Sequence, residues 1–145
     1  MKIVICGSID FSPQIIVAAD FLTKAGHSVE VPRLTQKIMA GEISYDDFMA
    51  TKASNGDIAF RQAEPGSLIK RYYDLIQEAE AVLVINATKR GVSGYIGANT
   101  FLEIGFAHVL DKKLFLMNPP APGNYADELA EMAPVVLNGD LNLIQ

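Results

Sequence analysis

Glu103 stands out in this sequence because the residues around it are almost all apolar. These neighbours are Phe101, Leu102, Ile104, Phe106 and Ala107. An ionised carboxylate is unfavourable in apolar surroundings, and a place in the first turns of a helix offsets only about 0.3–2 kcal/mol of that penalty. We therefore expect Glu103 to face a cleft, or else to pair with Arg71, Lys89 or a basic residue of a neighbouring subunit. Either outcome makes it the first candidate for a chemical role.

A second candidate is the turn formed by Gly7, Ser8 and Ile9, which follows an apolar run at 3–6. Backbone N–H groups at such a turn, together with the Ser8 hydroxyl, can surround an anion. The simple geometry of a strand-to-helix turn is the more common explanation.

A third group of polar and small residues follows the apolar run at 81–85. Its members are Asn86, Ser93, Gly97, Asn99 and Thr100. Ligands of open α/β sheets bind outside the carboxyl ends of the strands. The three groups are therefore expected to converge at one edge of a sheet.

The chain lacks the motifs of several common activities. Gly7 stands without the further glycines of G-x-G-x-x-G, and there is no Walker A sequence, which argues against NAD binding and ATP hydrolysis. No His, Cys, Asp or Glu pair has metal-ligand spacing. Cys6 is the single cysteine, and its apolar run predicts a buried, unreactive thiol. We therefore expect no metal site.

The elements that must position these residues follow from the apolar pattern. Continuous apolar runs predict buried strands at 3–6, 81–86 and 114–117, with shorter strands at 27–32 and 135–137. Helical spacing predicts helices at 13–25, 67–78, 99–110 and 125–132. The segment 33–66 predicts short helices, with turns at 54–57 and 64–66. The alternation predicts a three-layer α/β domain with a mostly parallel sheet of about five strands.

Length and charge narrow the function. The 145 residues suit one domain, 1–145, and 17 acidic against 12 basic residues give a net charge of −5. This balance argues against binding a nucleic-acid polymer. No apolar run approaches the ~20 residues of a membrane span, and no signal peptide is evident, so we expect a cytoplasmic protein that acts on a small molecule.

Three motifs resemble the nucleoside 2-deoxyribosyltransferase superfamily: Cys-Gly-Ser-Ile at 6–9, Ala-Glu-Ala-Val-Leu-Val at 79–84, and Glu-Ile-Gly-Phe-Ala at 103–107. The first of these looks most like the 2′-deoxynucleoside 5′-phosphate N-hydrolases. The resemblance implies a flavodoxin-like (Rossmann-like) fold, a homodimer or larger homo-oligomer, and no cofactor. It also implies a nucleophilic glutamate, matched by Glu103, that attacks C1′ of a 2-deoxyribosyl group and releases the base.

The sequence departs from this family at three positions. Val4 stands where the family has a tyrosine, and Tyr72 stands where it has a general-acid aspartate. Asp74 comes two residues later, which on a helix turns a side chain by about 200°. Gly97 replaces an Asp or Ser six residues before the glutamate. Tyr72, Tyr73 or Tyr95 could supply the missing hydroxyl.

Two functions follow from this reading. The first is cleavage or transfer at the N-glycosidic bond of a 2′-deoxynucleoside or its 5′-phosphate, with Glu103 as nucleophile and Tyr72 or Asp74 as proton donor. The alternative is a nucleotide-binding or sensor domain that has lost the catalytic pair. In the first, Gly7 and Ser8, together with Ser93, Asn99 or Thr100, would hold sugar and phosphate. In the alternative, Glu103 would hydrogen-bond a ribose hydroxyl. Attraction of an anion would be local, through residues such as Arg33, Lys89 or Arg90. The helix after Asn99, with Tyr45, Phe48 and Phe60, offers surface for self-association.

Overall fold

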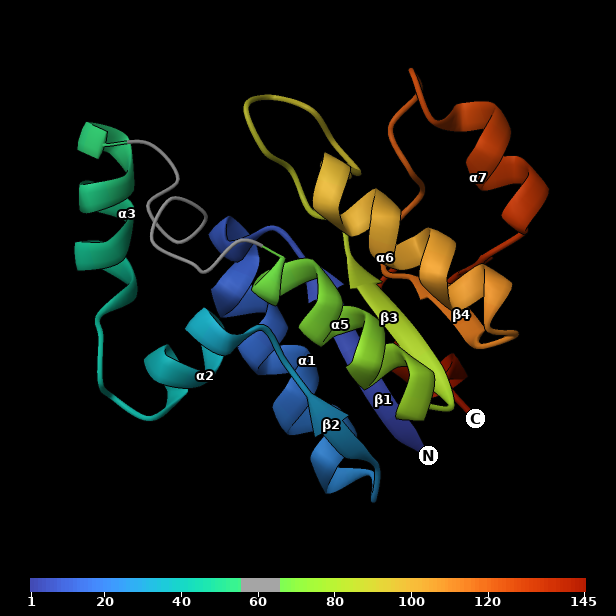
Figure 1. The fold of residues 1–145 in the computed structure, drawn as a ribbon, viewed down its shortest axis with the longest axis horizontal. Helices are drawn as coiled ribbons and strands as arrows, with labels where there is room; N and C mark the ends of the chain where they lie inside the picture. The colour runs from blue at the N-terminus through green and yellow to red at the C-terminus, as the bar shows by residue number, and fades with distance from the viewer. Residues whose placement is uncertain (56–65) are drawn as a thin grey trace.

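A single parallel sheet organises the molecule (Figure 1). The structure is a computed structural model, and it describes residues 1–55 and 66–145. The five strands are β1 (Lys2–Gly7), β2 (Ser28–Glu30), β3 (Ala81–Ile85), β4 (Lys113–Leu116) and β5 (Val135–Val136), in the order β2-β1-β3-β4-β5. All neighbouring pairs are parallel, which is the arrangement of flavodoxin-like folds and confirms the predicted α/β class.

Alternate residues of each strand face opposite layers. Ile3 and Ile5 of β1 lie in one apolar cluster with α1 (Ser12–Lys24) and the residues around η2 (Leu141–Leu143). Val4 and Cys6 lie in the other cluster. That second layer contains α5 (Ser67–Glu78), α6 (Ala98–Val109) and α7 (Ala126–Met132). The central strand β3 is buried throughout, because both of its faces are covered.

Three short elements lie at the carboxyl edge of the sheet, near the predicted site. They are η1 (Ile9–Phe11), α2 (Arg33–Met39) and α3 (Tyr45–Asn55). A buried hydrogen bond of 2.9 Å between the hydroxyls of Ser12 and Thr35 joins α2 to α1. Figure 1 shows α3 standing to one side of the sheet. The short helices predicted within 33–66 are confirmed, whereas most of the two predicted turns and Phe60 fall outside the described residues.

The carboxyl ends of β1 and β3 lie in very close contact. A Cβ built on Gly7 would lie 2.8 Å from the carbonyl oxygen of Ile85, so a side chain there would force the two strands apart. After this point the chain leaves β1 toward α1 and leaves β3 toward α6, on opposite faces. A crevice therefore opens at this edge, as expected where strand order reverses. Over the described residues, no helix is both long and apolar enough to cross a membrane.

Asn86 holds the ends of β3 and β4 together. It is fully buried, and its amide donates to the Asn118 carbonyl at 2.8 Å and accepts from the Asn118 N–H at 2.9 Å. The Asn118 amide returns a bond of 3.2 Å to the Asn86 carbonyl. The expected ligand-binding residue Asn86 therefore has its side chain engaged within the fold.

We expect Asn86→Ala to lower the free energy of unfolding by about 2–4 kcal/mol, because the buried Asn118 backbone would lose its partners. Urea denaturation measures this change. Asn124→Ala, at an exposed asparagine, is the control and should stay within about 0.5 kcal/mol of the parent. A loss below about 1 kcal/mol for Asn86→Ala would contradict the structural role.

Candidate active site

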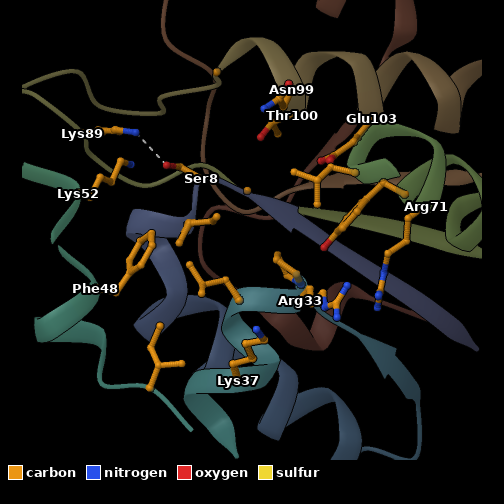
Figure 2. A pocket seen from close by; sticks show the side chains of 18 of the residues that line it. Ser8, Arg33, Lys37, Phe48, Lys52, Arg71, Lys89, Asn99, Thr100 and Glu103 are labelled. Atoms are coloured by element: carbon orange, nitrogen blue, oxygen red, sulfur yellow. Dashed lines mark hydrogen bonds between the residues drawn. The ribbon is translucent and has the colours of Figure 1, made fainter. Parts of the chain in front are cut away.

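A pocket of about 870 Å³ lies at the carboxyl ends of β1 and β3, with walls from α2, α3, α5 and α6 (Figure 2). Most residues predicted for the site line it: Gly7, Ser8, Ile9, Tyr72, Gly97, Asn99, Thr100 and Glu103. The first and last of these residues, Gly7 and Glu103, are 96 positions apart in the chain. The expected convergence at one sheet edge therefore occurs.

Three predicted site residues lie elsewhere. Asp74 is exposed and does not line the pocket, because two helical positions turn it away from the side that Tyr72 occupies. Ser93 is exposed on the loop after β3 and also lies outside the pocket lining. Asn86 is engaged with Asn118, as described above.

Glu103 projects from α6 into the pocket (Figure 2). Burial raises the pKa of its carboxyl to about 7, and a hydrogen bond with the Cys6 thiol acts in the opposite direction. Among the described residues neither Arg71 nor Lys89, the partners considered from the sequence, forms an ion pair with it. The carboxyl is therefore desolvated and lacks a neutralising cation in the part of the chain that the structure describes.

Cys6 and Tyr72 are the polar groups that accompany Glu103 on the sheet side. Cys6 is fully buried as predicted, and burial, followed by the nearby Glu103, raises the pKa of its thiol. Its contact with Glu103 was not foreseen. Burial also raises the pKa of Tyr72 well above 10, so its hydroxyl keeps its proton. That hydroxyl lies 3.5 Å from the Ile5 carbonyl, to which it donates.

Lysines gather at the other side of the pocket around Asp10 and Ser8. Lys89 donates to the Ser8 hydroxyl at 2.9 Å and lies 3.2 Å from the Asp10 carboxylate. Lys52 of α3 forms a second, short ion pair with Asp10. Burial opposes ionisation of Asp10, but the hydrogen bonds from both lysines outweigh it and lower its pKa. Lys89 also lies 5.2 Å from the centre of the Tyr95 ring.

Neither Lys52 nor the ion-pairing role of Asp10 was predicted from the sequence, whereas Arg90, a predicted candidate for attracting an anion, is exposed and lies outside the pocket lining. No local pattern marks Lys52, since its partner lies 42 residues away. The described lining contains five cations, Arg33, Lys37, Lys52, Arg71 and Lys89, against three acidic residues, Glu42, Asp47 and Glu103. The pocket is thus more positive than the chain as a whole, whose net charge is −5.

Comparisons with known proteins support the fold. No family model matches the chain, and no curated protein matches it. Among solved structures, the chain is similar to a CMP N-glycosidase, BcmB, from Clostridium botulinum. The TM-score is 0.53 and the identity 16%, over 94% of this chain and 85% of that one. At this identity the similarity shows a shared architecture.

The raised pKa of Glu103 predicts a pH-dependent stability. Between about pH 4.5 and 7 the folded state holds a proton that the unfolded chain releases, so this group destabilises the fold increasingly as pH rises. Glu103→Gln should therefore leave the free energy of unfolding unchanged at pH 4 and increase it by about 2–3 kcal/mol at pH 8. Urea denaturation at both pH values measures the difference.

Asp74→Asn provides the control, because it removes an exposed carboxylate from the neighbouring helix α5. We expect no more than about 0.5 kcal/mol of change at either pH. An equal gain for Glu103→Gln at pH 4 and pH 8 would show that the effect does not come from ionisation.

Proposed function

We propose that this protein cleaves the N-glycosidic bond of a nucleotide, with Glu103 as the nucleophile. The observation that carries this proposal is a desolvated carboxyl facing a pocket at the carboxyl edge of the sheet, with no ion pair among the described residues. If Glu103 had a structural role in an ion pair, a cation would keep its carboxylate ionised and engaged, and it would not be free to attack a substrate. The fold shared with a CMP N-glycosidase gives independent support.

In the proposed reaction, a Glu103 carboxylate oxygen attacks C1′ of the sugar. The bond from C1′ to the base nitrogen breaks, and the base leaves with the electron pair. A carboxylate suits this step because the transition state resembles an oxocarbenium ion, which an adjacent anion stabilises. Water then attacks C1′ of the sugar ester, the bond from C1′ to the Glu103 oxygen breaks, and the water gives up a proton to the departed base or to solvent, so that Glu103 returns as a carboxylate. Two displacements at the same carbon retain its configuration, and a second base in place of water would give transfer.

The leaving base must gain a proton or have its charge stabilised. Tyr72 lines the pocket with a hydroxyl that stays protonated across the physiological range, so we assign it the hydrogen-bond donor role. In that role its single O–H turns from the Ile5 carbonyl, 3.5 Å away, to the leaving base. Asp74, the other predicted donor, is exposed and outside the pocket lining, and we do not assign it a role in the reaction.

We assign the 5′-phosphate of the substrate to the side of the pocket formed by Ser8, Lys52 and Lys89. An ammonium group has three donors, and Lys89 gives two of them to Ser8 and Asp10. Its third donor and the Ser8 hydroxyl remain suitable for a phosphate oxygen. Asn99 and Thr100, at the first turn of α6, are the residues we expect beside the sugar.

The alternative function is nucleotide binding without cleavage. Its supporting observation is that α5 contributes no carboxyl group to the described pocket lining. Tyr72 stands at the position where a proton-donating carboxyl group would be expected. A calorimetric titration that shows nucleotide binding, together with an absence of base release, would favour it.

Self-association also stays a prediction. Leu102 and Val109 of α6 are 44% and 71% exposed, whereas Phe48 lines the pocket and Phe60 lies outside the described residues.

Base release tests the catalytic proposal. We expect the wild-type protein to liberate free base from CMP or a 2′-deoxynucleoside 5′-phosphate, measured by chromatography. Glu103→Ala and Glu103→Gln should lower the rate at least about 1,000-fold, while Asp74→Asn stays within about threefold. In the wild type, kcat/KM should rise with pH through about 7, as Glu103 ionises. Base release that survives Glu103→Ala would refute the nucleophile assignment.

Lys89→Met tests the phosphate assignment. Loss of a charge-assisted hydrogen bond should raise KM for a nucleoside 5′-phosphate about 10- to 100-fold and leave KM for the unphosphorylated nucleoside nearly unchanged. Arg90→Met removes the neighbouring cation, which lies outside the pocket, and should alter neither value. An equal rise for nucleotide and nucleoside would show that Lys89 acts through the shape of the pocket.

A further inference from the structure

Three cations of the pocket lack the kind of ion pair that Lys52 and Lys89 form with Asp10 among the described residues. Arg33 and Lys37 come from α2, and Arg71 comes from α5. Among the described residues, none of the three takes part in an ion pair within 4 Å. Figure 2 shows Arg33 and Arg71 converging on one part of the pocket, with Lys37 beside them and Ser8, Lys52 and Lys89 on the other side.

The guanidinium group of Arg71 has a buried donor without a described hydrogen-bond partner. Its Nε is out of contact with solvent and has no hydrogen-bond partner in residues 1–55 and 66–145. A buried donor left unsatisfied costs about 1–3 kcal/mol. Glu30 of β2 contributes to the raised pKa of Tyr72, the residue that follows Arg71. It forms no ion pair within 4 Å with Arg33 or Arg71. Arg33 and Arg71 thus lie in one part of the pocket (Figure 2), and neither forms an ion pair within 4 Å among the described residues.

We infer that Arg33, Lys37 and Arg71 form a second anion subsite, so that the ligand of this pocket carries an anionic group at each of two ends. The guanidinium group matches this role, because its planar donors bind a carboxylate or phosphate through two parallel hydrogen bonds. The pocket volume of about 870 Å³ lies near the upper end for small-molecule sites and leaves room for the larger ligand.

This inference rests on the proposed function, which fixes the order of groups along the pocket. With the 5′-phosphate at Ser8 and Lys89 and C1′ at Glu103, the second anion lies away from the 5′ end. It is an anionic oxygen group of one of two kinds: a carboxylate on the base, or a phosphate on the 3′ oxygen. Both present the same chemistry to the arginines, and the experiment below separates them.

The test compares three ligands by isothermal titration calorimetry, with Glu103→Gln as the background for every titration, because this variant prevents the proposed turnover. They are 2′-deoxyuridine 5′-phosphate, its 5-carboxy derivative and 2′-deoxyuridine 3′,5′-bisphosphate. We expect one of the two doubly anionic ligands to bind at least about tenfold more tightly than the monophosphate, and the tighter one identifies the source of the second anion. If neither binds more tightly, the inference is overturned.

Variants assign the preference to the proposed subsite. Arg33→Met and Arg71→Met should each reduce it to below about threefold, with little change in affinity for the monophosphate. Lys70→Met, at an exposed lysine next to Arg71 and outside the pocket lining, should retain the full preference. Preference that survives both arginine substitutions also overturns the inference.

Loss of the binding preference must be distinguished from misfolding of a variant and from failure of the proposed reaction. Arg71→Met removes an unpartnered buried N–H, so its melting temperature should equal or exceed that of the parent, and the exposed Arg33 gives an independent variant. Binding is measured without base release. Absence of cleavage with an intact binding preference would refute the proposed reaction alone, and cleavage of plain monophosphates without that preference would refute the second subsite alone.

Discussion

The parallel pairing of β1 with β3 is the contact on which the site depends. The register runs from Ile3 opposite Ala81 to Gly7 opposite Ile85, so both strands end at the same level. The absence of a side chain at Gly7 permits this, since a Cβ there would lie 2.8 Å from the Ile85 carbonyl oxygen. Beyond this point the chain turns to opposite faces of the sheet. The crevice thus follows from the strand order, and the residues that end each strand become its floor.

The same pairing determines the state of Glu103. Within β1, Val4 and Cys6 face the layer that contains α6, and Ile104 of α6 is fully buried against them. Glu103 precedes Ile104 and is therefore brought to the edge of the apolar cluster, where the Cys6 thiol reaches it. Desolvation by this packing raises the pKa of the carboxyl. Its reactivity, in the proposed function, is a consequence of how a helix is seated on a sheet.

These relations explain what the sequence could and could not predict. The strands and the long helices are recorded in local apolar patterns, and Glu103 is conspicuous against its own neighbours. The contact between Lys52 and Asp10 joins residues 42 apart, and that between Lys89 and Ser8 joins residues 81 apart, so no local pattern contains them. Asn86 and Ser93 were included because a polar residue after a strand looks the same whether it serves a ligand, the next strand or solvent.

The acidic character of the chain is compatible with an anionic ligand because the described pocket lining has more cationic than acidic residues. Burial lowers the pKa of Lys89, whereas the hydrogen bond that Lys89 donates to Asp10 opposes this effect. Asp10 therefore helps to keep Lys89 protonated, and its two ion pairs hold Lys89 and Lys52 on the Ser8 side of the pocket. A guanidinium group needs no such carboxylate nearby, because it keeps its proton even when buried. The two lysines around Asp10 thus have an internal counter-ion, whereas Arg33, Lys37 and Arg71 form no ion pair among the described residues. These unpaired cations of the pocket are the ones that point to an anionic ligand.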